Sequence, residues 1–171
     1  MTPEQRAAQI RLVALDVDGV LTDGRLYYGA QGEALKVFDV RDGHGIKMLL
    51  DQGVEVAILS ARSSEIVATR ARELGIRRVM QGRGNKADAW HELLAETGIR
   101  TEHAGFIGDD LPDLPVLAEA GLAATVADAR NEVKNVAHWI APQPGGRGAV
   151  RALAEFILQA KGVSFADLTQ G

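Results

Sequence analysis

The sequence has no cysteine, few aromatic residues and no long apolar run, and each of these absences excludes a class of protein. Without cysteine there is no disulfide framework and no thiolate zinc site. The net charge of -4 and the pI near 5.6 provide no basic surface for nucleic acid or an anionic membrane. No apolar run approaches the roughly 20 residues that span a bilayer, and the opening MTPEQRAAQIR lacks the apolar core of a secretory signal. We therefore expect a cytoplasmic protein with no nucleic-acid or membrane partner.

The chain has the length and composition of one globular domain. It contains 171 residues, of which 46% are hydrophobic and 25% are charged. Because only 5% are aromatic, the core has to be built mainly from alanine, valine, leucine and isoleucine. We expect a single domain over residues 1–171, with a C-terminal tail from about 161 to 171.

Short apolar runs alternate with helical patterns along most of the chain. The apolar runs are rich in β-branched residues and span 10–17, 54–60, 76–80, 103–108, 122–127 and 138–141. The helical patterns lie near 43–52, 63–74, 86–97, 111–120, 129–136 and 148–160. Strands that alternate with helices form right-handed crossovers. The pattern predicts an α/β fold in which helices cover both faces of a parallel sheet.

One segment interrupts this alternation. RLYYGAQGEALKVFDV, at 25–40, predicts two strands around the glycine-containing turn GAQG, hence a β-hairpin inserted after the first strand. Apolar side chains occur on both of its faces. A lone hairpin is marginally stable in water, so we expect this one to pack against a surface outside the main sheet.

Two aspartates separated by one residue, Asp16 and Asp18, end the first apolar run in LVALDVDGVLTDG. Carboxylates this close repel each other and are costly to desolvate, so another group has to compensate them.

Other polar side chains are expected at the same edge of the sheet, because ligands of α/β sheets bind at the carboxyl ends of the strands. Together with the first pair, the set is Asp16, Asp18, Ser60, Lys86, Asp109 and Asp110. Carboxylates bind Mg²⁺, while serine and lysine bind phosphate oxygens. The set predicts a magnesium-assisted phosphoryl-transfer site.

Structural interpretations of the same residues remain open at this point. Asp-Gly at 18–19 is also a turn sequence, and aspartate pairs often cap helices. Ser60 alone is typical of a helix cap. Lys86 fits a scaffold less well, because a cation in the first helical turn opposes the helix dipole.

Two competing motifs explain less of the sequence. An EF-hand loop that starts at Asp16 would need Asp or Asn where Val20 stands and Gly where Leu21 stands. GRGNKA at 82–87, with Glu102 beyond it, fits a dinucleotide-binding fingerprint. That motif follows the third main strand rather than the first, and it leaves the acids unexplained.

Taken in order, the polar motifs resemble those of the haloacid dehalogenase superfamily. DVDGVLTD resembles its first motif, Ser60 the second, Lys86 the third and GDD at 108–110 the fourth. The resemblance implies a Rossmann-like three-layer α/β/α fold with a parallel sheet and no separate cap domain.

A narrower resemblance covers about residues 8 to 160. The segment at 23–46, MQGRGNK at 80–86 and GGRGAV at 145–150 are similar to the 3-deoxy-D-manno-octulosonate-8-phosphate (KDO-8-phosphate) phosphatase family. Two departures from that family are Ala61, where glycine is usual, and Lys47, where arginine is usual. Alanine allows fewer backbone conformations than glycine, and lysine lacks the bidentate fork of arginine.

The resemblance implies a role for each motif residue. Asp16 is expected to attack phosphorus and form an aspartyl-phosphate, and Asp18 to serve as general acid and then general base. Mg²⁺ is expected to bind the Asp16 carboxylate, the Asp18 carbonyl and Asp109. Ser60 and Lys86 are expected to bind phosphate.

Further roles follow from the same resemblance. Asp110 is expected to support the site. The residues expected to contact the sugar acid are Asp39, Val40, Arg41, Asp42, Gly43, Lys47, Arg62 and Arg70. An aspartate at position 18 favours a phosphatase over a dehalogenase or an ion-pumping ATPase, which lack this acid.

Two rival functions are also considered. A receiver-type signalling domain also uses strand-end acids, Mg²⁺, a hydroxyl and a lysine, but it has no general acid two residues after its phosphorylated aspartate. A phosphatase for nine-carbon sialic-acid 9-phosphates is a nearer relative, although those relatives carry glutamate where this chain has Arg62.

The family is tetrameric, so the resemblance implies a homotetramer joined through the hairpins. No segment is long enough to form a cap, so we expect a neighbouring chain to complete the active site. Arg147 and the tail after Lys161 are the candidates for covering it.

Overall fold

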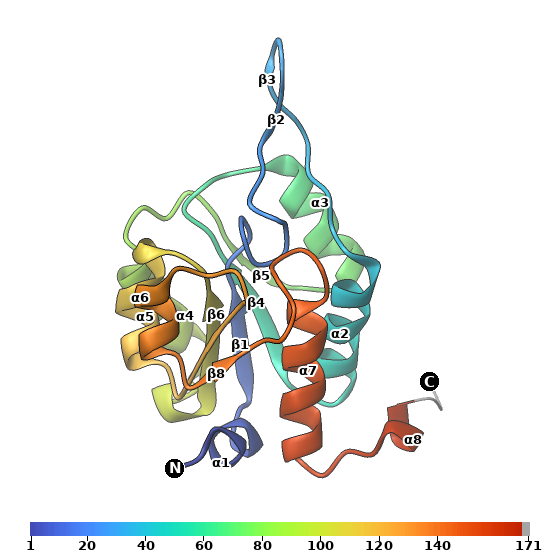
Figure 1. The fold of residues 1–171 in the computed structure, drawn as a ribbon, viewed down its shortest axis with the longest axis vertical. Coiled ribbons are helices and arrows are strands. Elements are labelled where there is room, and N and C mark those ends of the chain that lie inside the picture. Colours follow the sequence, from blue (N-terminus) through green and yellow to red (C-terminus); the bar gives the residue numbers. More distant parts are fainter. Residues whose placement is uncertain (169–171) are drawn as a thin grey trace.

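A six-stranded parallel sheet forms the centre of the molecule, as the sequence predicts (Figure 1). The computed structural model describes residues 1–168. In spatial order the strands are β5 (Arg78–Met80), β4 (Glu55–Leu59), β1 (Leu12–Leu15), β6 (Ala104–Gly108), β7 (Leu122–Thr125) and β8 (Trp139–Ile140). The first strand of the chain therefore lies inside the sheet, between strands that occur much later in the sequence.

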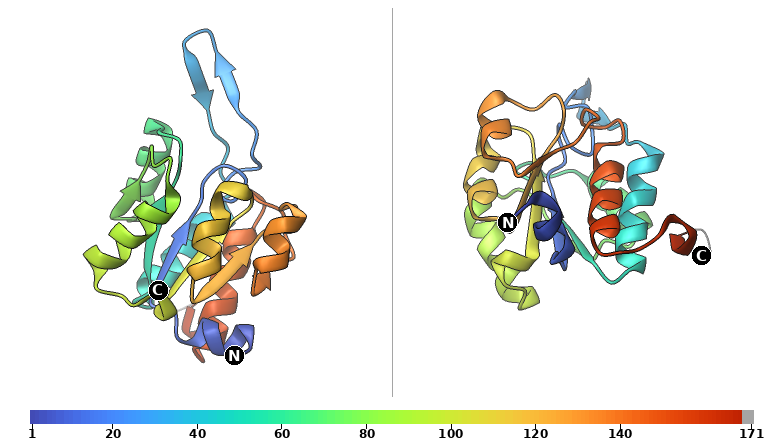
Figure 2. Two further views of the ribbon diagram at one scale, coloured as in Figure 1. Left: turned by 90° about the vertical axis from the view of Figure 1, so that its left-hand side faces the viewer. Right: turned by 60° about the horizontal axis from the view of Figure 1, so that its bottom comes forward.

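Helices cover both faces of this sheet, which makes three layers (Figures 1 and 2). On one face lie α1 (Pro3–Ala8), α2 (Val40–Asp51), α3 (Glu65–Leu74) and α7 (Ala149–Ala160). On the other lie α4 (Lys86–Thr97), α5 (Leu114–Glu119) and α6 (Asn131–Val136). Short 3₁₀ turns at Thr101–His103 and Leu111–Asp113 lead into β6 and α5.

The strand and helix boundaries follow local side-chain chemistry. Every residue of β1, β6 and β7 is buried, because helices cover both faces of these strands. Ser64 and Asn85 cap the N-termini of α3 and α4 through their side-chain oxygens. Gly75 and Gly98 end the same two helices in the left-handed conformation.

No helix among residues 1–168 is long and apolar enough to cross a membrane.

The inserted hairpin is present and is shorter than expected. It forms a separate antiparallel sheet of β2 (Tyr27–Gly29) and β3 (Gly32–Leu35), which projects beyond the carboxyl edge of the main sheet (Figure 1). The chain leaves the strand conformation after Leu35, and Val40 already begins α2. The Asp39 side chain caps that helix by accepting a hydrogen bond from the backbone N–H of Arg41 at 2.7 Å.

Short helices at the two ends of the chain were not predicted. At the N-terminus, Thr2 and Gln5 form a capping box that begins α1. The segment expected to be a tail, about 161–171, contains α8 (Phe165–Leu168), and its last three residues, 169–171, lie outside the described residues.

Candidate active site

The polar residues predicted for one edge of the sheet do line a single cleft, of about 320 Å³. It lies at the carboxyl ends of the central strands, on the side from which the hairpin projects. Asp16 and Asp18 follow β1, Ser60 follows β4, and Asp109 follows β6. Lys86 enters as the first residue of α4. The other lining residues are Gly24, Ala61, Arg62, Asp110, Pro112 and Asp113.

Lys86 is the buried cation of this cleft. Its ammonium group donates to Asp16 Oδ1 at 2.7 Å and to Asp113 Oδ1 at 2.5 Å. Burial by itself would lower the pKa of Lys86, but the charges of Asp16 and Asp113 outweigh that effect and raise it. Lys86 is therefore held as a cation beside the carboxylate predicted to be the nucleophile, where a phosphate dianion would also need a positive charge.

Asp113 was not among the residues predicted from the sequence. Its Oδ2 accepts hydrogen bonds from the backbone N–H groups of Asp109 at 2.9 Å and Asp110 at 3.2 Å. Asp113 thus fixes the loop that carries the predicted metal ligand, and it also holds Lys86. The capping-box spacing between Asp110 and Asp113, with proline between them, is the local signal that identifies it.

The carboxylates of Asp16, Asp109 and Asp113 form a cluster whose oxygens lie within 4.8 Å of one another. Burial, followed by the charge of Asp113, raises the pKa of Asp16 to about 6. Burial and the charges of Asp16 and Asp113 raise the pKa of Asp109 to about 8. Such a cluster favours a bound cation, and its all-oxygen donor set suits Mg²⁺. Since both oxygens of Asp113 already accept hydrogen bonds, Asp16 and Asp109 are better placed as ligands.

Two glycines allow these acids to approach each other. A side chain at Gly19 would overlap the Asp109 carboxylate, and Gly19 has a φ of +93°. A side chain at Gly108 would overlap the Asp113 carboxylate. The glycine of the Asp-Gly sequence at 18–19 therefore serves a turn and also leaves room for the Asp109 carboxylate.

The glycine-rich segment 145–148 packs against the loop that follows Asp18. A side chain at Gly145 or Gly146 would overlap the backbone of residues 19–23, and the backbone N–H of Gly146 donates to the carbonyl of Val20 at 2.9 Å. Arg147, between Gly146 and Gly148, is exposed. The GGRG motif therefore places the start of α7 against the loop that follows Asp18.

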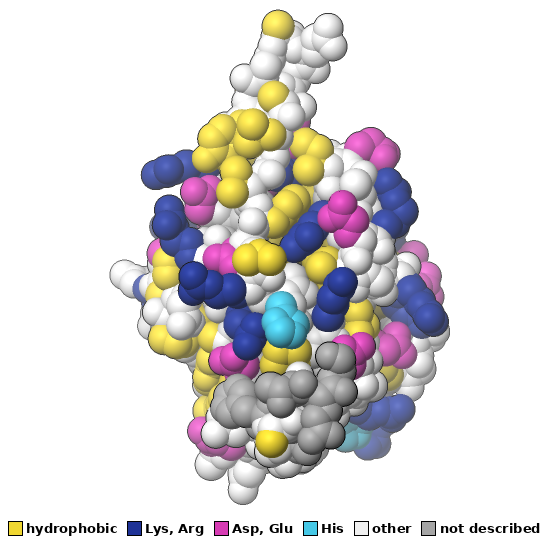
Figure 3. Space-filling model, turned by 90° about the vertical axis from the view of Figure 1, so that its right-hand side faces the viewer, with side chains coloured by type: hydrophobic (Ala, Val, Ile, Leu, Met, Phe, Trp, Pro, Cys, Tyr) yellow, Lys and Arg dark blue, Asp and Glu magenta, His cyan; other side chains and the backbone are white. Residues whose placement is uncertain are grey.

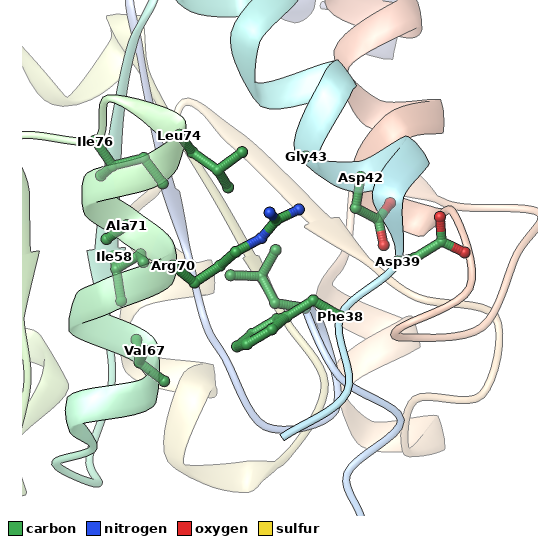
Figure 4. Close-up of a pocket in the computed structure, with 11 residues that line it drawn as sticks. Phe38, Asp39, Asp42, Gly43, Ile58, Val67, Arg70, Ala71, Leu74 and Ile76 are labelled. Carbon is green, nitrogen blue, oxygen red and sulfur yellow. The ribbon is translucent and has the colours of Figure 1, made fainter. Parts of the chain in front are cut away.

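Several residues predicted to contact the sugar lie outside the catalytic cleft. Asp39, Asp42, Gly43 and Arg70 line a separate, largely apolar pocket between α2 and α3, with Phe38 (Figure 4). The Arg70 guanidinium lies 5.9 Å from the centre of the Phe38 ring and against Gly43, where a Cβ would collide with it. Three more of the residues predicted to contact the sugar are exposed on α2, namely Val40, Arg41 and Lys47.

Asp42 has an additional structural role. Its carboxylate accepts hydrogen bonds from the backbone N–H groups of Gly148 at 3.3 Å and Arg151 at 2.9 Å. Gly148 is the N-cap of α7 and has no side chain that could satisfy these donors. Asp42 therefore caps α7 from α2, and burial raises its pKa.

The acidic cluster gives a prediction about stability. Because the pKa values of Asp16 and Asp109 are raised on folding, their protons stabilise the fold below about pH 4, and this contribution is lost as the pH rises through 6 and 8. Mg²⁺ replaces those protons. We expect saturating Mg²⁺ to raise the melting temperature by roughly 5–10 °C near pH 8 and by much less near pH 5. Thermal melts in EDTA and in Mg²⁺ check this, and equal melting temperatures near pH 8 would contradict the metal site.

Comparisons with known proteins identify the relatives of this chain. Residues 75–153 match the model of a family described as haloacid dehalogenase-like hydrolase. A 3-deoxy-D-manno-octulosonate 8-phosphate phosphatase (KdsC) of Yersinia pestis is 48% identical over 157 residues, which are 92% of this chain and 84% of that protein. The KdsC of Haemophilus influenzae is 46% identical over 169 residues, which are 98% of this chain and 94% of that protein.

A solved structure is similar over nearly the same length. The crystal structure of the phosphatase from Moraxella catarrhalis, in complex with magnesium ion, phosphate ion and KDO, is 41% identical. It matches with a TM-score of 0.91 and covers 94% of this chain and 92% of that one.

Proposed function

Because this chain belongs to the KDO-8-phosphate phosphatase family of haloacid dehalogenase-like hydrolases, we propose that it hydrolyses KDO-8-phosphate to KDO and phosphate. The reaction would serve lipopolysaccharide precursor synthesis in the cytoplasm, and one domain spanning the chain would carry it out. The observation that carries the proposal is the pair Asp16 and Asp18 in one cleft with Lys86 and Asp109. Family membership disfavours the receiver-type signalling domain.

In this proposal Asp16 and Asp18 carry out the first half of the reaction, and their place in one cleft supports it. Lys86 holds Asp16 Oδ1, so Oδ2 is the oxygen that attacks phosphorus. The phosphorus–oxygen bond of the ester breaks, and the sugar oxygen leaves with the electron pair and takes a proton from Asp18. Ser60 and Lys86 hold the transferring phosphoryl oxygens. A magnesium ion on Asp16, the Asp18 carbonyl and Asp109 would neutralise charge on the phosphoryl group.

In the second half, Asp18 takes a proton from water while the water oxygen attacks the aspartyl-phosphate. The bond between phosphorus and Asp16 breaks, which restores the carboxylate and releases phosphate. Ala61, which stands where the family has glycine, fits this site, since no described residue other than glycine has a positive φ.

Arg62 supports an acidic sugar as the substrate. Its side chain is 42% exposed at the cleft, and its Nε lies 3.7 Å from Asp18 Oδ2. An arginine here can pair with a carboxylate of the leaving sugar. The alternative is a sialic-acid 9-phosphate, whose phosphatases have glutamate at this position.

A comparison of substrates tests this assignment. We expect kcat/KM in Mg²⁺ to be at least about 10-fold higher for KDO-8-phosphate than for N-acetylneuraminate 9-phosphate, which corresponds to about 1.4 kcal/mol. Arg62→Glu is expected to reduce that preference, because the pairing with the carboxylate is lost. A higher kcat/KM for the nine-carbon substrate would overturn the choice of sugar but not the phosphatase activity.

We further propose that the enzyme works as a homotetramer. Apolar side chains gather below the tip of the hairpin (Figure 3). Within the hairpin and just after it, Tyr28 is 62%, Leu35 46% and Val37 57% exposed. Arg70 and Asp39–Gly43 do not line the catalytic cleft of their own chain. They could contact substrate if a neighbouring chain presented its cleft to them, and Arg147 and the segment after Lys161 remain candidates for covering the site.

The hairpin gives a test of the oligomer. Val37→Asp places a charge on the exposed apolar surface and is expected to dissociate the assembly and reduce activity together. Light scattering during gel filtration measures the mass, and Val136→Asp on α6, where the valine is 41% exposed, is the control. Full activity of an 18.3 kDa monomer would contradict this proposal.

A further inference from the structure

The Lys36 side chain is buried beside Asp18, just after the second strand of the hairpin. It is only 2% exposed. The ammonium group donates to Asp18 Oδ1 at 2.6 Å and lies 2.9 Å from Glu33 Oε1. Burial by itself would lower the pKa of Lys36, but its hydrogen bonds to Asp18 and Glu33 outweigh that effect and raise it.

This geometry differs from an ordinary surface ion pair. Exposed ion pairs contribute little to stability because water screens the two charges and both side chains remain free to move. Lys36 has almost no contact with water, and two carboxylates fix its position. A buried ammonium group in this position also has little surface left with which to bind a substrate. The observed contacts therefore favour a role that acts through Asp18.

Glu33 connects the Lys36–Asp18 pair to the start of α3. Its second carboxylate oxygen accepts a hydrogen bond from the Ser64 hydroxyl at 2.5 Å, and Ser64 is the N-cap of α3. Lys36 is thus held by a carboxylate that is itself fixed to the helix following the second motif. The base of the hairpin and the start of α3 form one support for the Asp18 side chain.

The other oxygen of Asp18 is in a different environment. The Nε of Arg62 lies 3.7 Å from it, and Arg62 Nη2 donates to the hydroxyl of Tyr28 at 3.1 Å. Oδ1 is therefore engaged by a short, charge-assisted hydrogen bond, whereas Oδ2 has no contact this short with a described residue. Since a carboxyl group transfers its proton through one oxygen, the contact with Lys36 selects Oδ2.

We propose that Lys36 is the positioning residue for Asp18, and that it holds Oδ1 so that Oδ2 faces the leaving sugar oxygen. The inference rests on the proposed phosphatase activity. When the phosphorus–oxygen bond breaks, the proton moves from Oδ2 to the sugar oxygen, and it is replaced when water attacks the aspartyl-phosphate. Lys36 neither donates that proton nor contacts the substrate. Glu33 and Ser64 keep the ammonium group in place.

The dependence of the rate on the leaving group tests this role. The alkoxide of a sugar is a poor leaving group unless it is protonated as it departs. The p-nitrophenolate anion is stable enough to depart without a proton. A correctly placed general acid contributes about 10²–10⁴-fold. We therefore expect Lys36→Met to lower kcat/KM roughly 10–100-fold for KDO-8-phosphate and less than about 3-fold for p-nitrophenyl phosphate. If KDO-8-phosphate is not turned over, glucose 6-phosphate serves as the alkyl ester.

Control variants separate positioning from a loss of structure. Lys134→Met removes a lysine of α6 outside the cleft and is expected to change neither rate. Glu33→Gln keeps a hydrogen-bond acceptor for Lys36 but removes a charge. It should also lower kcat/KM more for KDO-8-phosphate than for p-nitrophenyl phosphate, but by a smaller factor than Lys36→Met does. Glu33→Gln is also the test to use if Lys36→Met does not fold, which circular dichroism and a thermal melt would show.

The outcomes distinguish this inference from the proposed function. Equal losses on both esters in these variants would mean that Lys36 only stabilises the fold or binds phosphate, and would overturn the inference. Unchanged rates on both esters would also overturn it. A wild-type protein that hydrolyses neither ester in Mg²⁺ would instead contradict the proposed phosphatase activity.

Discussion

Replacing Asp16 with asparagine is expected to reduce phosphatase activity by at least about 1,000-fold while the fold is retained. The amide is nearly isosteric with the carboxylate but is a poor nucleophile. The same change removes one charge from the acidic cluster, where the charge of Asp16 helps to raise the pKa of Asp109. Near neutral pH the metal-free variant should therefore be at least as stable as the wild-type protein.

Steady-state rates with p-nitrophenyl phosphate in Mg²⁺, together with a thermal melt, measure both effects. Asp51→Asn at the exposed end of α2 is the matched control, because it makes the same chemical change away from the cleft. An Asp16→Asn variant that keeps a tenth of the wild-type activity would show that another group attacks phosphorus.

Lys86→Met is expected to have the largest effect on stability. The change leaves the buried carboxylates of Asp16 and Asp113 without their shared cation. Removal of one partner from a buried ion pair costs about 3–5 kcal/mol of unfolding free energy. The variant should also lose nearly all activity, because the phosphate loses its buried positive charge. Urea unfolding in EDTA measures the loss of stability, with Lys134→Met as the control.

A second substitution checks the electrostatic cause of that loss. Adding Asp113→Asn to Lys86→Met removes one of the two unpaired charges and should recover part of the unfolding free energy. A loss below about 1 kcal/mol for Lys86→Met alone would mean that water or backbone groups already compensate these carboxylates.

The sheet and the position of the catalytic cleft could be predicted because both depend on short-range patterns. Strands such as VEVAILS are buried on both faces and read as continuous apolar runs, so their order along the chain is visible. The site residues stand at the ends of those runs. Strand termini converge in a parallel sheet, so the grouping of Asp16, Ser60 and Asp109 required no knowledge of side-chain contacts.

The contacts that the sequence did not identify are those between residues that are distant in the chain. Lys36 meets Asp18 across the hairpin, and Asp42 caps a helix that begins more than 100 positions later. Neither contact has a local signature. Asp113 is the exception, because its capping-box spacing was visible in GDDLPD. The hairpin was predicted as too long because apolar residues continue after Leu35, at Val37 and Phe38, where the chain in fact turns toward α2.

The central position of β1 has a consequence for synthesis of the protein on the ribosome. The apolar strand Leu12–Leu15 emerges early, but its two neighbours are Glu55–Leu59 and Ala104–Gly108. At about 5–20 residues per second, the second neighbour follows roughly 5–20 s later. During that interval the nascent chain exposes a strand edge that a chaperone or another nascent chain could bind. The strand that precedes Asp16, the proposed nucleophile, therefore keeps one edge unpaired until Ala104–Gly108 has been made.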